Sequence, residues 1–155
     1  MKVFGIDPGS EQSAYVIWNG EEILAKGILE NGKMVYLLMD YGNGLLTRVV
    51  IEQVRSYGMP VGATVFDTVF WSGRFCQAWP NEFHQMPRLK VKQHICHDSR
   101  AKDSNIIQAL VDRFAYGVRN KGKGTKPEPG FFYGFKKDIW QAFALAVTWH
   151  DQNYG

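Results

Sequence analysis

The chain has 155 residues, of which 45% are hydrophobic and 14% aromatic, and its formal net charge is +3 at pH 7. This length fits one domain, residues 1–155, that buries enough apolar surface to fold without disulfides or structural metals. The mild charge identifies no class of partner, and Cys76 and Cys96 are too few for a disulfide framework or a four-ligand zinc site. No signal-peptide core and no apolar run of about 18 residues occurs, so we expect a protein of the reducing cytoplasm with no membrane partner.

Hydrophobic periodicity and turn signals predict alternating strands and helices along the whole chain. Strands are expected at 2–6, 12–19, 22–29, 48–54 and 83–86. Helices are expected at 33–41, with Gly42 and Gly44 ending it, and at 63–79, 87–96, 101–116 and 138–150. The first three strands form an antiparallel meander in this prediction, and the later elements add further strands and helices. This order predicts an α/β sheet of mixed direction.

Two carboxylates stand within apolar strand sequences. Asp7 ends the first strand, and Glu52 lies inside Val49–Val54. A lone carboxylate in an apolar strand is costly unless it is paired or binds a metal. If the two strands are neighbours, the carboxylates face each other and repel, and a Mg²⁺ or Mn²⁺ ion between them removes the conflict. The alternatives are a turn aspartate at position 7 and a surface glutamate on an edge strand at position 52.

Asp138 is a third candidate, at the start of the last predicted helix. Aspartate is a favoured N-cap, so capping is one explanation for its presence. Metal binding is the other, because nucleases that cleave phosphodiesters use three or four carboxylates to hold two metal ions about 3.5–4 Å apart.

The segment 117–137 before that helix carries six Lys or Arg residues against one acid, together with four aromatic residues. A long segment without predicted structure in a compact domain is usually functional or disordered. We expect its part from Arg119 to Lys137 to become ordered on DNA, with Lys121, Lys123 and Lys126 contacting phosphates. A solvated surface loop is the alternative.

Other candidates are weaker when taken one at a time. Tyr57 lies in a Gly/Pro-rich loop, where it can stack on a base or pack within the loop. Lys92 and Lys102 flank a predicted helix–loop–helix and are either solvated or phosphate-binding. The cluster His94, Cys96 and His97 lacks the second ligand pair that a zinc site needs.

Taken together, four motifs resemble the RuvC-type Holliday junction resolvases of the RNase H-like superfamily, in the same order along nearly the whole chain. They are Phe-Gly-Ile-Asp-Pro-Gly-Ser at 4–10, Ile-Glu-Gln-Val at 51–54, Val-Lys-Gln at 91–93 followed by Arg-Ala-Lys-Asp at 100–103, and Lys-Asp-Ile-Trp-Gln-Ala-Phe-Ala-Leu-Ala at 137–146. The runs at 56–62, 71–75 and 101–106 resemble RuvC-like proteins of bacteriophages and prophages more closely still.

The resemblance implies a five-stranded mixed sheet flanked by helices, a homodimer, and Mg²⁺-dependent nicking of four-way DNA junctions, with Mn²⁺ as a substitute. It carries Asp7, Glu52 and Asp138 over as metal ligands. Lys92 and Lys102 carry over as phosphate-contacting or catalytic lysines.

The chain departs from the family pattern at two positions. Gln141 stands where the family has another acidic residue, one turn after Asp138. The two positions share a helix face, so the weaker amide ligand still reaches the site. Arg55 stands where the family has the aromatic residue that opens the junction, and Tyr57 is the candidate to take over this role.

We expect an endonuclease that acts on branched DNA. The first alternative is a junction-binding module of the same fold that cuts weakly because of Gln141. The second is an actin-like or sugar-kinase ATPase, which needs a second lobe and a second phosphate loop. The homodimer interface is expected on the helix at 63–79, which is rich in Phe66, Phe70, Trp71 and Phe75.

Overall fold

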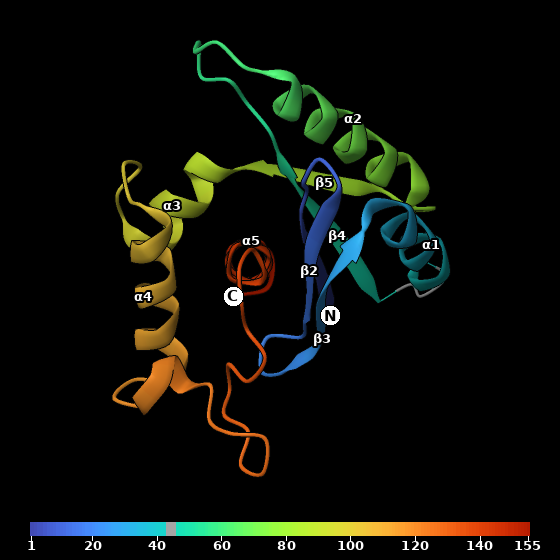
Figure 1. Cartoon of the computed structure of the whole chain (residues 1–155). Coiled ribbons are helices and arrows are strands. Elements are labelled where there is room, and N and C mark those ends of the chain that lie inside the picture. Colours follow the sequence, from blue (N-terminus) through green and yellow to red (C-terminus); the bar gives the residue numbers. More distant parts are fainter. Residues whose placement is uncertain (43–45) are drawn as a thin grey trace.

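In the computed structural model, which describes residues 1–42 and 46–155, a mixed sheet separates two groups of helices (Figure 1). The strands are β1 (Lys2–Asp7), β2 (Gln12–Trp18), β3 (Ile23–Glu30), β4 (Thr47–Gln53) and β5 (Phe83–Pro87). The helices are α1 (Asn31–Tyr41), α2 (Ala63–Ala78), α3 (Arg88–Cys96), α4 (Asp103–Phe114) and α5 (Ile139–Tyr154), with a 3₁₀ turn η1 (Arg119–Gly122). Each predicted strand and helix is found within a few residues of its expected bounds; Gly44, predicted to end α1, lies outside the described residues.

The strand order is β3-β2-β1-β4-β5. β1 pairs with β2, and β2 with β3, in antiparallel fashion, whereas β1–β4 and β4–β5 are parallel. The predicted five-stranded mixed sheet is therefore confirmed, and β1 and β4 are direct neighbours.

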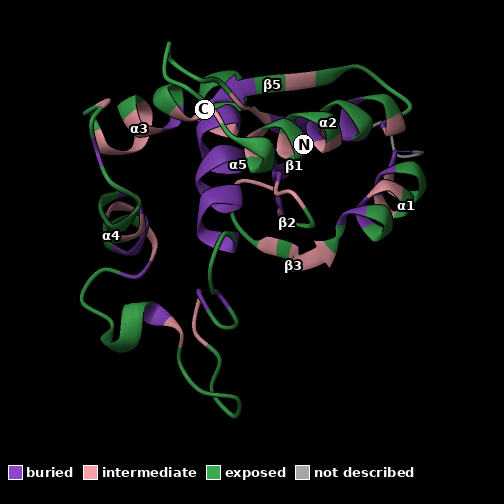
Figure 2. Cartoon of the chain, turned by 45° about the horizontal axis from the view of Figure 1, so that its top comes forward, coloured by how far each residue is buried: buried purple, intermediate pink, exposed green. Residues whose placement is uncertain are grey.

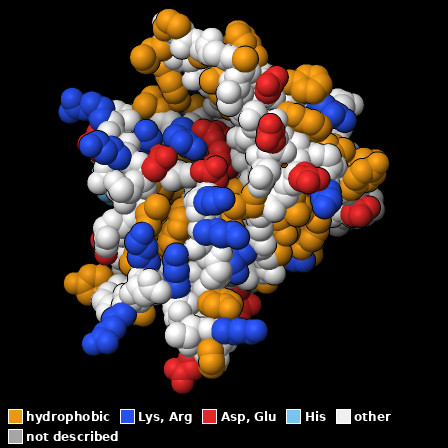
Figure 3. Space-filling model, viewed as in Figure 1, with side chains coloured by type: hydrophobic (Ala, Val, Ile, Leu, Met, Phe, Trp, Pro, Cys, Tyr) orange, Lys and Arg blue, Asp and Glu red, His pale blue; other side chains and the backbone are white. Residues whose placement is uncertain are grey.

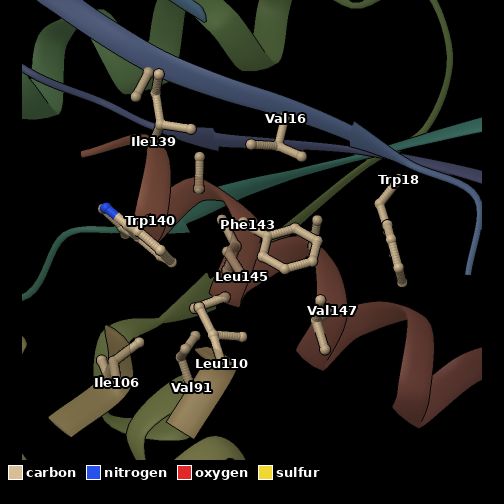
Figure 4. Packing of buried hydrophobic residues seen from close by; sticks show 14 of the residues in the cluster. Val16, Trp18, Val91, Ile106, Leu110, Ile139, Trp140, Phe143, Leu145 and Val147 are labelled. Carbon is tan, nitrogen blue, oxygen red and sulfur yellow. The ribbon is translucent and has the colours of Figure 1, made fainter. Parts of the chain in front are cut away.

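Two hydrophobic cores lie on the two faces of the sheet. One lies under α1 and α2 and includes Phe4, Ile6 and Ile51. The other surrounds α5, which is buried from Ile139 to Trp149 (Figure 2). Figure 4 shows side chains of α5, such as Phe143, between the strands and side chains of α3 and α4. No helix in the described part of the chain is long and apolar enough to cross a membrane.

A close approach of α5 to β1 depends on Gly5. A Cβ atom at this position would lie 2.7 Å from the Ala142 carbonyl oxygen and 3.0 Å from the Ala146 Cβ. The small residues on both elements thus allow the helix to pack directly on the strand that carries Asp7.

The prediction that the stretch from Arg119 to Lys137 becomes ordered only on DNA is wrong. Hydrogen bonds from the amides of Gly130 and Phe132 to the carbonyls of Lys123 and Gly122, both 3.0 Å long, fold the segment on itself. Phe132 and Phe135 are buried in the core around α5. The aromatic residues anchor the segment because their burial stabilises the fold, and the glycines supply the turns between them.

The phenylalanines of α2 lie in two different environments, which the sequence did not predict. Phe75 is fully buried against the sheet, so its assignment to an interface is wrong. Phe66 and Phe70 remain 64% and 61% exposed, and Val69 lies exposed between them. We call the surface formed by Phe66, Val69 and Phe70 the α2 stripe.

Candidate functional site

The two predicted strand carboxylates lie side by side at the carboxyl ends of parallel strands. Ile6 of β1 is paired with Ile51 of β4 and both side chains lie in the core under α1 and α2. Because side chains alternate along a strand, the next residues, Asp7 and Glu52, point to the opposite face, toward α5. Asp7 is 6% exposed. The pairing that the sequence analysis made conditional on strand order is therefore present.

The environment of Asp7 disfavours its negative charge. Burial, followed by the hydrogen bond to Glu52 and the charge of Glu52, raises the pKa of Asp7 well above its ordinary value. Asp138 acts in the same direction at longer range, and Arg88 acts against it. A cation nearby would offset the repulsion between the buried Asp7 and the half-buried Glu52.

Arg88, which sequence reasoning missed, supplies that cation. Its Nε lies 3.2 Å from Glu52 Oε1, its Nη2 lies 3.5 Å from Asp7 Oδ1, and its Nη1 lies 3.6 Å from Asp103 Oδ1. It is the first residue of α3, directly after Pro87, which pairs with Gln53. In the sequence Arg88 is a basic residue that follows the strand predicted at 83–86, but the pairing of that strand with β4 is seen only in the fold.

Gln141 lies in the same site, as the helical spacing predicted. It is 7% exposed and lines a small cavity together with Asp7, Glu52, Arg88 and two apolar side chains. The volume of this cavity is about 10 Å³, which is roughly the space for one water molecule.

Asp138 is close enough to influence the charges but does not complete the set of carboxylates. It precedes α5, is exposed, and makes no side-chain cap to the helix. It lines a neighbouring open cavity of about 390 Å³ together with Gly9, Thr68 and Lys137. Within residues 1–42 and 46–155, no three Asp, Glu, His or Cys side chains are gathered closely enough to hold a metal ion.

The two candidate lysines lie on elements that border the site. Lys92 is one turn after Arg88 on α3 and is half-buried. Lys102 is exposed and immediately precedes Asp103, which faces Arg88. Figure 3 shows acidic side chains gathered near the middle of one face, with Lys and Arg side chains beside and below them.

The loop after β4 contains Arg55 and Tyr57. Arg55 Nη2 and Nε donate hydrogen bonds to Gln53 Oε1 at 2.6 and 3.0 Å. The hydroxyl of Tyr57 accepts a hydrogen bond of 3.4 Å from the Leu89 amide, at the start of α3. Tyr57 nevertheless remains 53% exposed, so it is accessible from solvent.

Lys121 and Lys126 are exposed on the folded segment 117–137, and Lys123 is half-buried. None of the ion pairs described for this structure joins them to the carboxylates of the site.

His94 belongs to a polar cluster that joins three helices. Its Nε2 lies 2.8 Å from Asp151 Oδ2, which also accepts a 2.6 Å hydrogen bond from Arg113. Although burial opposes the effect, these two partners hold the pKa of Asp151 below its usual range. The cluster ties α3, α4 and α5 together.

No family model and no curated protein matches the sequence. Solved structures do match. RuvC from Thermus thermophilus is similar with a TM-score of 0.65 at 17% sequence identity, over 98% of this chain and 96% of that chain. T. thermophilus RuvC in complex with a Holliday junction substrate gives a TM-score of 0.66 at 16% identity, over 96% and 92% of the two chains.

The chain has the fold of RuvC. This RNase H-like α/β fold, with its five-stranded mixed sheet, is the fold class that the motifs predicted.

The donor atoms of the site fit a hard divalent cation. Carboxylate oxygens of Asp7 and Glu52 and the amide of Gln141 surround one small space, and hard cations prefer oxygen ligands. The guanidinium of Arg88 already stands between the two carboxylates as an organic cation. The folded chain thus already places a positive charge beside Asp7 and Glu52.

Proposed function

We propose that this protein is a metal-dependent, structure-selective endodeoxyribonuclease that cleaves four-way or other branched DNA junctions. The supporting observation is the pair formed by the buried Asp7 and the half-buried Glu52 near the ends of adjacent parallel strands in a RuvC fold. A Holliday junction is the substrate bound in one of the similar RuvC structures. We further propose a bacteriophage or prophage type of enzyme that acts in the bacterial cytoplasm.

In this proposal Asp7, Glu52 and Asp138 hold Mg²⁺, or Mn²⁺ in its place, and Gln141 adds a neutral amide oxygen. Such ions activate water and stabilise the leaving oxygen of an in-line displacement. Asp7 on β1 and Glu52 on β4 would position the reacting phosphate, because these two strands are direct neighbours in the sheet. Lys102, with Lys92, binds the phosphate backbone beside them, and cleavage leaves 5′-phosphate and 3′-hydroxyl ends.

The direct test is incubation with a labelled four-way junction, a fork and a linear duplex, each with Mg²⁺, Mn²⁺ or EDTA. We expect symmetric cleavage of the junction with either metal, little cleavage of the duplex, and none in EDTA. Equal cleavage of all three DNA forms would contradict structure selectivity, and cleavage in EDTA would contradict metal dependence.

The second candidate function is a junction-binding module that cuts weakly. It is favoured by Gln141, a buried neutral residue in the site, and by the pairing of Arg88 with both strand carboxylates. Binding without metal-dependent cleavage in the same experiment would select this candidate.

The variant Gln141→Asp should raise the cleavage rate and lower the Mg²⁺ concentration needed for half-maximal activity. The added carboxylate lies at the cavity that Asp7 and Glu52 share, and a charged ligand binds Mg²⁺ more strongly than an amide. Gln152→Asp, at an exposed position of the same helix, is the matched control. If both variants behave like the wild type, Gln141 is a packing residue only.

Lys121, Lys123 and Lys126 are proposed to contact DNA phosphates. If Z cations contact phosphates, log affinity falls with log salt at a slope of about −0.9Z. Replacing all three with Ala should flatten this slope by roughly two to three units and weaken binding to every DNA shape. Lys33→Ala on α1 is the control, and an unchanged slope in the triple variant would leave Lys92 and Lys102 as the phosphate contacts.

We also propose a homodimer formed through the α2 stripe, because a four-way junction has two-fold symmetry and needs paired cuts. Light scattering at micromolar concentration should give a dimer for the wild type and a monomer for Phe66→Asp/Phe70→Asp. Tyr36→Asp, at an exposed position of α1, should remain dimeric. A wild-type monomer that still cuts symmetrically would contradict the proposed interface.

A further inference from the structure

Arg88 occupies the place that a divalent ion needs. Its guanidinium spans carboxylates from β1, β4 and the start of α4, at 3.5, 3.2 and 3.6 Å. Besides Nε on Oε1, Nη2 lies 3.4 Å from Glu52 Oε2, so both oxygens of Glu52 face this one side chain. Asp7 and Glu52 are the carboxylates that the proposed function assigns to the metal.

The site has no room for Arg88 and a hydrated ion together. The cavity between Asp7, Glu52, Arg88 and Gln141 measures about 10 Å³. Mg²⁺ requires six ligands at about 2.0–2.1 Å and usually keeps several waters. A divalent ion between the two carboxylates therefore has to replace the guanidinium.

The Arg88 side chain can also move away from Asp7 and Glu52, toward solvent. Its side chain is 31% exposed, and Asp103, with a side chain 56% exposed, lies on the solvent side of the group. Asp103 belongs to α4 and not to the strand pair, so it can keep its contact with the guanidinium while Asp7 and Glu52 release theirs. An exchange of cations avoids leaving the buried Asp7 and the half-buried Glu52 without a positive partner, which is unfavourable.

We propose that Arg88 is a built-in competing cation, which a divalent ion must displace from Asp7 and Glu52 and which Asp103 then retains. The proposal rests on the proposed metal-dependent function. It implies that the free protein binds metal more weakly than its carboxylates alone would allow.

The test is calorimetric titration of Mn²⁺ into the free wild-type protein and into Arg88→Gln, without DNA. Removing the competing cation should tighten Mn²⁺ binding by about tenfold or more and should enlarge the rise in melting temperature that Mn²⁺ produces. Arg100→Gln is the matched control, because it removes an exposed positive charge near α4 without freeing a carboxylate of the site. It should bind Mn²⁺ like the wild type.

Arg88→Lys covers the case in which Arg88→Gln does not fold. A lysine keeps the charge but is a point donor that cannot bridge three carboxylates, so it should tighten Mn²⁺ binding by a smaller factor. If the folded variants bind Mn²⁺ no tighter than the wild type, Arg88 does not compete and the inference is overturned. If neither wild type nor variants bind Mn²⁺, the proposed metal-dependent function itself fails.

A double-mutant cycle tests the role of Asp103. Asp103→Asn should weaken Mn²⁺ binding several-fold in the wild-type background, because the displaced guanidinium loses its remaining partner. In the Arg88→Gln background it should have little effect. Equal weakening in both backgrounds would show that Asp103 acts on the metal by its charge, and would overturn the retention step.

Discussion

Asp7→Asn and Glu52→Gln should each reduce junction cleavage by more than about 100-fold while junction binding in EDTA is retained. Changes to residues that only support metal ligands already cost about 10–100-fold, so loss of a ligand should cost more. Asp138→Asn is expected to act in the same direction. Single-turnover cleavage of a labelled junction and a gel-shift titration measure the two properties separately.

The substitution Asp7→Asn should not destabilise the fold. Burial and Glu52 raise the pKa of Asp7, so the folded chain disfavours its charge, and a neutral amide of the same shape relieves the repulsion. We therefore expect Asp7→Asn to melt no lower than the wild type. Glu30→Gln, at the exposed end of β3, is the control for removal of one negative charge. If Asp7→Asn, Glu52→Gln or Asp138→Asn cleaves junctions near the wild-type rate, the substituted residue does not belong to the catalytic site.

The positions of Asp7 and Glu52 were predictable because they depend on the local sequence pattern and on the pairing of β1 with β4. An apolar strand with one acid identifies each residue, and the parallel register of β1 and β4 brings both to the same face. The helical spacing of positions 138 and 141 likewise brought Gln141 to the site. The exposed position of Asp138, however, depends on how the chain enters α5, and the sequence pattern does not determine this.

Arg88 could not be placed by the same means. Its partners come from β1, β4 and α4, so its contacts depend on the pairing of β5 with β4 and on the direction in which α3 leaves that strand. In the sequence it is one more basic residue after a proline. The residue that most changes the charge of the site was thus set by tertiary structure.

Aromatic residues were the other source of error, because burial is decided by neighbours and not by residue type. Phe132 lies in the stretch that was expected to become ordered only on DNA, and it is fully buried, whereas Phe66 has the same side chain and is 64% exposed. The two differ in what surrounds them: Phe132 packs with Phe135 and Trp140, with ring centroids 5.0 and 4.7 Å away.

The largest effect on stability is expected for Phe143→Ala. Phe143 is fully buried in the first half of α5, and its ring centroid lies 5.0 Å from Trp18, 5.3 Å from Phe114 and 5.6 Å from Phe135. It therefore joins the sheet, α4 and the folded segment 117–137 through one side chain. Truncating a buried phenylalanine costs about 3–5 kcal/mol.

For a domain of this size, 1 kcal/mol corresponds to a shift of about 2–4 °C in melting temperature. Phe143→Ala should therefore lower the melting temperature by roughly 6–20 °C. Thermal unfolding followed by circular dichroism measures the shift. Tyr116→Ala is the matched control, because Tyr116 is 83% exposed and its truncation should change the melting temperature little. The segment 117–137 should also become more sensitive to protease in Phe143→Ala, since its anchoring aromatics lose a common partner. Equal melting temperatures for the two variants would contradict the packing of α5. This packing sets the positions of Gln141 and Asp138.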